Sequence, residues 1–538
     1  MSGFAGFMNT ATPGALVRRM GRVIDARGPV ARHEVEAPGC AFVVTQSGGG
    51  GRPVATLEGW TVAIDGQVLN AASLAREMGF DPADGPAATV ARLLRQVGGA
   101  QTLSRLAGPA AVAAWNPDER VGFVSRDRIG ERPVFVASEG DGLAFASEAR
   151  ALSQAGLAGS LDPAALRRFV AASAVVPPGS WARGARALAP GAWEELGVQR
   201  RQSRGWNLPV PTPGAGGNRE RWLKSVRFAL DHAFSARARV AGPYAIGVSG
   251  GLGSAALLAC LPAHDRPSLA LVLDDEGEAS AARAGIRAQR VRVDANAVFD
   301  EVALDAPVGT PVGLAYLALA RAAWAEGLSG LALGTGHGYA FDPPRPLLGD
   351  RLGQLIQPRS GLRRFLDEVG PLPGDAEAGV FAEVEALAAA VPVDDVAAGA
   401  HWLGGRVTLP EVHLRDAVAA CAAYGLVPLL PMVDQGVIQV ATQVPCGVHH
   451  HRARRSLLAE LGGVVSRDPA WPAVPMELPP DLDRQLGGLV SAAHVRAVVR
   501  DPAWASRAFR LASLAQWLGA GAGGLVVERG PAAAPAWG

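Results

Sequence analysis

Short apolar runs rich in β-branched and aromatic residues alternate with turn-forming residues over the first 157 positions of the chain. Alternation of this kind predicts strands. Between the strands, apolar residues return at three- and four-residue steps, which predicts helices over residues 13–24 and 87–97. We therefore expect an α+β sandwich in this half. The predicted strands are residues 40–45, 54–57, 61–64, 110–115, 122–125, 134–137 and 143–146.

A connector with a predicted helix at residues 163–172 leads to residues 207–217, whose proline and glycine content is typical of an exposed linker. Beyond it, residues 220–240 have the pattern of an amphipathic helix. Strands and helices then alternate, which favours a parallel, doubly wound sheet whose ligands bind beyond the carboxyl ends of the strands. We expect strands at residues 245–248, 269–273, 290–293 and 328–333, and helices at residues 255–261, 279–286 and 314–326.

The part of the chain after residue 344 has a mainly helical pattern that glycine and proline interrupt. Residues 526–538 are rich in alanine and proline, and we predict a disordered tail there.

The composition narrows the class of protein. The chain has 538 residues, of which 49% are hydrophobic, and this length suggests two or three domains. Lysine and arginine number 51 against 50 acidic residues, so no basic surface points to nucleic acid. The four cysteines are far apart and form neither a zinc pattern nor a disulfide framework. No apolar stretch reaches the roughly 20 residues of a membrane helix, and the start does not resemble a signal peptide, so we expect a soluble, cytoplasmic protein without a membrane partner.

The predicted strand at residues 245–248 runs into a glycine-rich turn and a helix, an arrangement that presents backbone N–H groups to phosphate. The turn reads SGGLGS over residues 249–254, which resembles the SGGLDS pyrophosphate loop of the asparagine synthetase family. Other segments resemble that family in the same order along the chain. They are residues 1–7 (MSGFAGF), 64–70 (IDGQVLN), 124–135 (VSRDRIGERPVF), 143–152 (LAFASEARAL), 331–341 (LALGTGHGYAF) and 431–434 (PMVD).

The resemblance implies a fold that is α+β in the first half and α/β in the second. Residues 1–160 are expected to form an Ntn-hydrolase-like αββα sandwich, a glutamine amidotransferase type 2-like domain. Residues 161–217 are the connector and linker. Residues 218–525 are expected to form a PP-loop ATP pyrophosphatase domain with a doubly wound parallel sheet and a mainly helical C-terminal part, followed by the tail.

Departures from the family pattern fall on the residues that would hydrolyse glutamine. Ser2 stands where relatives have the nucleophilic cysteine, and a hydroxyl is a far weaker nucleophile. Asp65 replaces the asparagine that would stabilise an oxyanion, which puts a negative charge where a donor is required. Val30 replaces an aspartate, and residues 87–90 (AATV) replace the segment that would hold the amino group of glutamine. We therefore expect no glutaminase activity.

The second half departs from the family where magnesium would bind. Gly253 and Gly338 replace the two aspartates that hold Mg²⁺ in relatives, and Tyr339 replaces a glutamate. The resemblance implies ATP as cofactor, and Mg²⁺ only if other carboxylates take over. Asp274, Asp275 and Asp342 are the candidates, or else they are ordinary solvated loop acids. The residues expected around the nucleotide are Ser249, Gly250, Gly251, Leu252, Gly253, Ser254, Leu271, Gly334, Gly336 and His337.

The C-terminal region lacks the lysine that relatives use in amide formation. Arg454, Arg455 or Arg467 are the candidates to supply positive charge there, although arginine is not equivalent to lysine. Three adjacent histidines at residues 449–451 cannot all face one ion, so we read them as a polar loop or a phosphate-side contact. We assign no catalytic residue and no metal ligand.

Three functions remain open. The first is an ATP-dependent amide-bond-forming ligase that takes an amine directly, as in the β-lactam synthetase and lasso-peptide cyclase branches. Its substrate would be a carboxylate or a precursor peptide, and its partner a companion peptidase or recognition protein. The second is a catalytically degenerate paralogue that serves as a binding module for a peptide or an active homologue. The third is an asparagine synthetase that uses ammonia.

Overall fold

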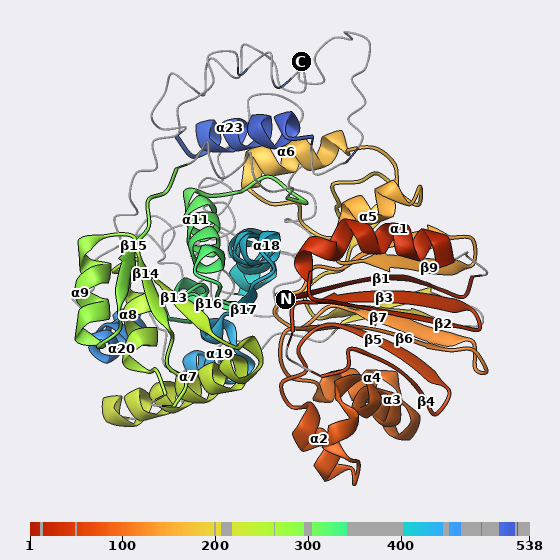
Figure 1. The fold of residues 1–538 in the computed structure, drawn as a ribbon, viewed down its shortest axis with the longest axis horizontal. Helices are drawn as coiled ribbons and strands as arrows, with labels where there is room; N and C mark the ends of the chain where they lie inside the picture. The colour runs from red at the N-terminus through yellow and green to blue at the C-terminus, as the bar shows by residue number, and fades with distance from the viewer. Residues whose placement is uncertain are drawn as a thin grey trace, which may run out of the picture.

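The computed structural model contains a sandwich of two antiparallel sheets and a separate parallel sheet with helices around it (Figure 1). The sandwich, in red and orange, lies on the right of the figure, and the parallel sheet, mostly in green, lies on the left. The residues that the structure describes are 1–10, 14–48, 51–197, 201–205, 218–262, 264–294, 304–341, 402–444, 451–463, 482, 486, 505–521 and 525.

Strand β1, Ser2–Met8, runs through the middle of the first antiparallel sheet and is buried along its whole length. It pairs with β3 on one side and with β9 on the other. Helices α1 (Gly14–Ile24) and α5 (Ala149–Gln154) cover the outer face of this sheet (Figure 1). The strand order is β10-β8-β9-β1-β3-β2, with β2 at Ala31–Ala37, β3 at Cys40–Gln46, β8 at Phe135–Glu139, β9 at Gly142–Ala146 and β10 at Ala185–Ala187.

The second antiparallel sheet lies face to face with the first. Phe4, Phe42 and Phe145 from the first sheet and Trp115 from the second fill the space between them. Helices α3 (Pro86–Val97), α2 (Ala71–Glu77) and α4 (Gly99–Arg105) cover the outer face, so the half has four layers and the expected sandwich is confirmed (Figure 1). The strand order is β12-β11-β7-β6-β5-β4, with β4 at Val54–Leu57, β5 at Trp60–Gly66, β6 at Ala110–Asn116, β7 at Val121–Ser125, β11 at Ala192–Leu196 and β12 at Arg201–Gly205.

The third sheet is parallel throughout its five strands, as predicted. Its central strand, β13 (Tyr244–Val248), shares Ile246 with the core under helix α7 (Arg219–Ala241) and Ala245 with the core under α11 (Pro311–Ala325), so helices cover both faces. The strand order is β15-β14-β13-β16-β17, with β14 at Leu269–Val272, β15 at Ala288–Arg290, β16 at Gly330–Ala332 and β17 at Val427–Leu429. The other helices named below are α8 (Leu252–Ala259), α9 (Asp275–Arg283), α12 (His337–Phe341), α18 (Arg415–Ala423), α19 (Gln435–Gln443), α20 (His451–Gly462) and α23 (Ala505–Gly519).

Strand β17 lies in the C-terminal region, where the sequence predicts a mainly helical pattern and no strand. It is three residues long, includes Pro428 and is buried, so it offers no alternation that would distinguish it from a buried helix segment. The sequence also did not predict β1, β2 or the three strands β10 to β12. Strand β1 is buried on both faces and contains Gly3 and Gly6, which explains why its pattern was not recognised.

Helix α8 begins at Leu252, three residues before the start predicted from the sequence. Gly253 and Ser254, which are weak helix formers, therefore lie in its first turn and not in the preceding loop. Helix α9 also begins earlier than predicted, because Asp274 caps it by accepting a hydrogen bond from the N–H of Gly277.

Expectations for the linker at residues 207–217 and for the tail at residues 526–538 lie outside the described residues. Within the described part of the chain, no helix has the length and apolar character that a membrane crossing needs.

Candidate functional site

Three strands bring Ser2, Asp65 and Ser147 together near the N-terminus of the chain. The hydroxyl of Ser2 donates to Oδ1 of Asp65 at 2.7 Å, and Ser147 donates to Oδ2 at 2.6 Å. The backbone N–H of Gly66 donates to Oγ of Ser2 at 2.6 Å. Ser2, Asp65 and Ser147 are all buried. The carboxylate is thus engaged by both hydroxyls, and the N–H of Gly66 is bonded to Ser2.

Arg27 holds the backbone at this centre. Its Nε donates to the carbonyl oxygen of Ser2 at 3.2 Å, and its guanidinium pairs with Glu148 at 3.3 Å. Glu148 also pairs with Arg150 at 2.5 Å. Arg27 therefore holds the start of β1 in place through contacts with other protein groups.

The remaining positions expected to contact glutamine do not form a pocket at this centre. Val30 is 71% exposed. Residues 87–90 lie in α3, and Ala87 and Val90 are packed in the apolar core beneath the second sheet. The segment that relatives use for the amino group of glutamine is therefore part of the packing here.

The predicted phosphate-binding corner joins β13 to α8, as the sequence indicated. Gly250 has a φ of 64°, which glycine adopts without strain. Oγ of Ser254 donates to the carbonyl oxygen of Gly251 at 3.0 Å and accepts from the N–H of Ser249 at 3.4 Å. Ser249 and Gly250 are partly exposed, so a strand-to-helix corner with accessible backbone is present.

The second loop, residues 334–337, packs directly against the first turn of α8. A Cβ at Gly253 would lie 2.7 Å from the carbonyl oxygen of Gly334 and 2.7 Å from Nδ1 of His337. A Cβ at Gly334 would lie 2.7 Å from the carbonyl carbon of Gly253. Nδ1 of His337 is 3.0 Å from the carbonyl oxygen of Gly334. The imidazole therefore fills the space that a side chain at position 253 would need.

Three other residues expected around the nucleotide pack against neighbouring apolar side chains or lie in a buried helix or strand. Gly336, with a φ of 92°, lies against Val433, which is 2.1 Å from the position of a Cβ. Leu252 is buried in α8, and Leu271 is fully buried in the core of the parallel sheet. The structure thus brings Gly253, Gly334 and His337 together, whereas Leu271 packs in the hydrophobic core.

The carboxylates considered as replacements for the missing magnesium ligands have other roles where the structure describes them. Asp274 caps α9, and exposed Asp275 pairs with Arg290 at 2.5 Å. Glu276 lies beside the corner, with its Cβ 2.8 Å from the position of a Cβ on Gly250. Among the described residues, no three His, Cys, Asp or Glu side chains are arranged to hold a metal ion. Asp342, His449, His450 and Arg467 lie outside these residues, and nothing is described of the side chains of His451, Arg454 and Arg455.

His413 is a nearby residue that the sequence did not single out. Burial lowers its pKa, an effect that Asp416 opposes and to which the neighbouring His337 adds. It lies in a short π-helical turn, Leu409–Leu414, a feature that is frequent at functional sites. A lone histidine has no spacing signal in the sequence, so only the fold reveals it.

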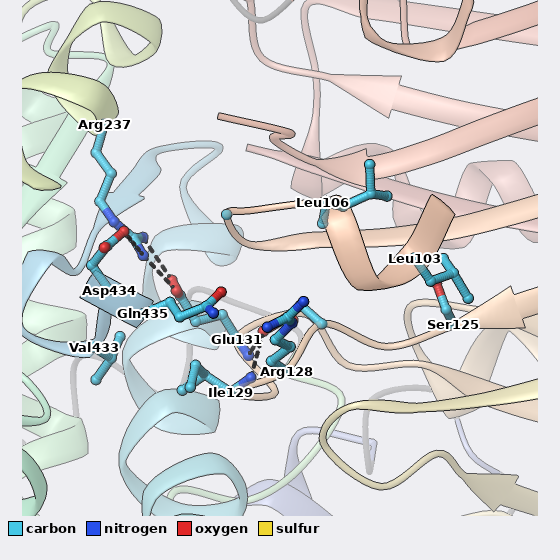
Figure 2. A pocket seen from close by; sticks show the side chains of 13 residues that line it. Leu103, Leu106, Ser125, Arg128, Ile129, Glu131, Arg237, Val433, Asp434 and Gln435 are labelled. Carbon is cyan, nitrogen blue, oxygen red and sulfur yellow. Dashed lines mark hydrogen bonds and ion pairs between the residues drawn. The ribbon is translucent and has the colours of Figure 1, made fainter. Parts of the chain in front are cut away.

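A small cleft, with a cavity volume of about 30 Å³, lies between the sandwich and the parallel-sheet half (Figure 2). Glu131 and Arg237 form a buried two-point ion pair across it, with distances of 2.7 and 2.9 Å. A second buried pair, Arg126 with Glu411 at 2.7 Å, also links the two halves. The cleft is lined from one side by Leu103, Ser125 and Ile129, and from the other by Val433, Asp434 and Gln435.

The four-layer sandwich with a serine at the start of its central strand defines an Ntn-hydrolase-type fold for the first half of the chain. Residues 1–207 match the family model described as the glutamine amidotransferase domain. The chain is therefore a protein with an N-terminal glutamine amidotransferase domain of class II.

Two solved structures show a weak overall likeness to this chain. One is described as the allosteric regulatory enzyme of purine biosynthesis, with 14% identity, a TM-score of 0.29 and coverage of 68% of this chain and 78% of that chain. The other is glutamine phosphoribosylpyrophosphate amidotransferase from B. subtilis complexed with ADP and GMP, with 13% identity, a TM-score of 0.29 and coverage of 74% and 94%. No curated protein sequence matches this chain.

Proposed function

We propose that this chain is an asparagine-synthetase-like protein that has lost both amide hydrolysis and Mg-ATP chemistry and serves as a binding module for a peptide or for an active homologue. The observation that carries the proposal is the packing of His337 against Gly253. A carboxylate at position 253 and the imidazole of His337 need the same space. The loss of the aspartate and the gain of the histidine are thus complementary changes.

Electrostatics at the corner support the same conclusion. Relatives of the family use two carboxylates to hold the metal that neutralises pyrophosphate, and these positions are glycines here. Glu276 lies against Gly250, and its carboxylate pairs with Arg283 at 3.3 Å, so it is not free to hold a cation at the corner. Without a bound cation, only the backbone N–H groups would attract a triphosphate there.

The N-terminal centre supports a non-catalytic role for the first half. Asp65 accepts hydrogen bonds from Ser2 and Ser147, and the N–H of Gly66 is engaged by Ser2. A donor is needed where the oxyanion of an amide forms, and a carboxylate repels it. The sandwich therefore acts as a packed partner of the second half.

An amide-forming ligase is the second candidate, and one observation favours it. The corner at Ser249 and Gly250 keeps its strand-to-helix geometry and part of its exposure, which are the features that hold phosphate in nucleotide-binding folds. In that case another cation would have to take the place of the metal between the loops. The third candidate, an asparagine synthetase that uses ammonia, needs the same metal, and no observation favours it over the ligase.

The experiment is an ATP–pyrophosphate exchange assay on the full chain with Mg²⁺ and a panel of carboxylates, aspartate and peptides included. The proposal predicts no exchange and no AMP release. A matched variant, Gly253→Asp/His337→Ala/Gly338→Asp, reinstates the carboxylates and vacates the space of the imidazole. Carboxylate-dependent exchange by the wild-type chain contradicts the proposal and favours the ligase. A companion measurement, light scattering of the chain mixed with an active homologue, tests for the partner.

A further inference from the structure

A cavity of about 390 Å³ lies on the outer face of the second antiparallel sheet. Helices α3 and α4 cover this face (Figure 1), and the junction between them contributes to the lining. The volume lies within the range of roughly 300–1,000 Å³ that is typical of small-molecule pockets. The cavity shares no residue with the corner at Ser249 or with the centre at Ser2, so the inference drawn from it is independent of the function proposed above.

Three aromatic side chains from three different strands form one wall of the cavity. They are Trp60 at the start of β5, Phe123 in β7 and Trp193 in β11. All three are buried in the apolar core under α3, and the ring centroids of Trp60 and Phe123 are 6.2 Å apart. Packing therefore fixes these rings. A wall of this kind suits an apolar ligand group, and tryptophan also attracts cations through its π face.

Two glutamates line the cavity together with these rings. Glu195 lies two residues after Trp193 in β11, so both side chains are on the same face of the sheet. Glu119 lies in the turn between β6 and β7. Oδ1 of Asn116 fixes this turn by accepting from two of its backbone N–H groups, one of them that of Glu119 at 3.1 Å. The strand and the turn thus hold both carboxylates at the cavity.

Arg95 in α3 is the one cation among the described residues that line the cavity. Its Nη1 is 3.8 Å from Oε1 of Glu119, and the two side chains are 62% and 52% exposed. An exposed pair at this distance is weak, so the guanidinium can turn away into solvent. Two carboxylates and one guanidinium leave the lining with an excess of negative charge.

Two glycines keep the junction of α3 and α4 free of side chains. Gly98 ends α3 with a φ of 79° and a ψ of 170°, a conformation that is essentially restricted to glycine. A Cβ at Gly98 would meet no atom of the described residues within 4 Å. Gly99 begins α4 beside Phe123, whose Cε1 would be 3.4 Å from a Cβ on Gly99. The junction therefore leaves space beside this ring that larger residues would take up.

We propose that this cavity binds a small organic cation, a primary ammonium group carried on an apolar chain or ring. The apolar part packs against Trp60, Phe123 and Trp193, and the carboxylates of Glu119 and Glu195 attract the ammonium. An anion of the same size meets two like charges, and a neutral molecule gains only the apolar contact. Two sources present this group, a free amine and the lysine side chain of a peptide.

Titration calorimetry of the full chain tests the class of ligand. Phenethylamine and phenethyl alcohol have nearly the same size, but only the amine is charged at neutral pH, and hydrocinnamate has the opposite charge. We expect phenethylamine to bind about tenfold more tightly than the alcohol, and hydrocinnamate not to bind. Equal affinity for amine and alcohol, tighter binding of hydrocinnamate, or no binding of the amine overturns the proposal.

A second pair of ligands separates the two sources. Butylamine and acetyl-lysine methylamide carry the ammonium on the same four-carbon chain. Tighter binding of butylamine supports a free amine as the ligand, and tighter binding of the lysine derivative supports a peptide side chain.

Substitutions locate the site. Glu119→Gln and Glu195→Gln keep the size of the side chain and remove its charge, so each should weaken phenethylamine binding by about threefold to tenfold. Arg95→Gln removes the competitor for Glu119 and should strengthen binding of the amine, whereas an anion site would be weakened. Glu77→Gln is the matched control, because this exposed glutamate pairs with Arg105 and does not line the cavity. Wild-type affinity in the folded Glu119→Gln and Glu195→Gln chains, or weaker binding by Arg95→Gln, contradicts the proposal.

Discussion

The substitution Gly253→Ala probes the contact between α8 and the loop at residues 334–337. The added Cβ would lie 2.7 Å from a backbone oxygen of Gly334 and 2.7 Å from the ring of His337, closer than real Cβ atoms approach other atoms. The ring is braced by the carbonyl oxygen of Gly334, so it cannot move away freely. Overpacking of this kind costs about 1–3 kcal/mol. His337→Ala removes one of the two obstacles, so we expect a coupling of about 1–2 kcal/mol between the substitutions.

The assay is thermal unfolding of four proteins: the wild type, Gly253→Ala, His337→Ala and the double variant. For a domain of roughly 150–250 residues, 1 kcal/mol corresponds to about 2–4 °C in Tm. Gly253→Ala should lower Tm in the wild-type background by at least that much more than in the His337→Ala background. Gly338→Ala is the control, because no atom of the residues that the structure describes lies within 4 Å of the added Cβ, and it should not lower Tm. Equal losses in both backgrounds would refute the idea that the imidazole fills the space of residue 253.

Three further predictions concern the rest of the molecule. Arg237→Met leaves buried Glu131 without its partner and should lower the free energy of unfolding by about 3–5 kcal/mol, which is measured as a lower Tm. The double variant Glu131→Leu/Arg237→Met should regain most of that stability. A small loss of stability in the single variant would contradict this prediction. Burial raises the pKa of Asp305 to about 6 from an ordinary 3.8, so ionisation of this carboxyl disfavours the folded state. The stability of the wild type should therefore fall as the pH rises from about 4 to 7, and Asp305→Asn should make Tm depend less on pH. An identical pH dependence of Tm in the two proteins would contradict this prediction. Ser2→Cys should release no glutamate from glutamine, because Asp65 still faces the nucleophile, and release above background would show that reasoning to be wrong.

Much of the fold could be predicted from patterning, because strands such as Val54–Leu57 and helices such as Pro163–Ala172 are bounded by strong local signals. The elements that were missed have no such signal. Strand β1 is buried on both faces and therefore shows no alternation, and β17 is too short and contains a proline. Both depend on long-range pairing, which local sequence does not encode.

The candidate site was predictable only where residues are neighbours in the chain. The corner from Ser249 to Ser254 follows from a strand, glycines and a helix in succession. The packing of His337 against Gly253 joins segments more than 80 positions apart, so it required the fold. Arg132 was part of a recognised motif, yet nothing in its sequence context indicates that it is buried against Met1.

The most direct test of the central claim is titration calorimetry of the full chain with ATP in the presence of Mg²⁺, alongside the Gly253→Asp/His337→Ala/Gly338→Asp variant. If His337 has replaced the metal-binding carboxylates, the wild type should give no binding heat with Mg-ATP, and the variant should bind. Magnesium-dependent ATP binding by the wild type at the level of the variant would contradict the account.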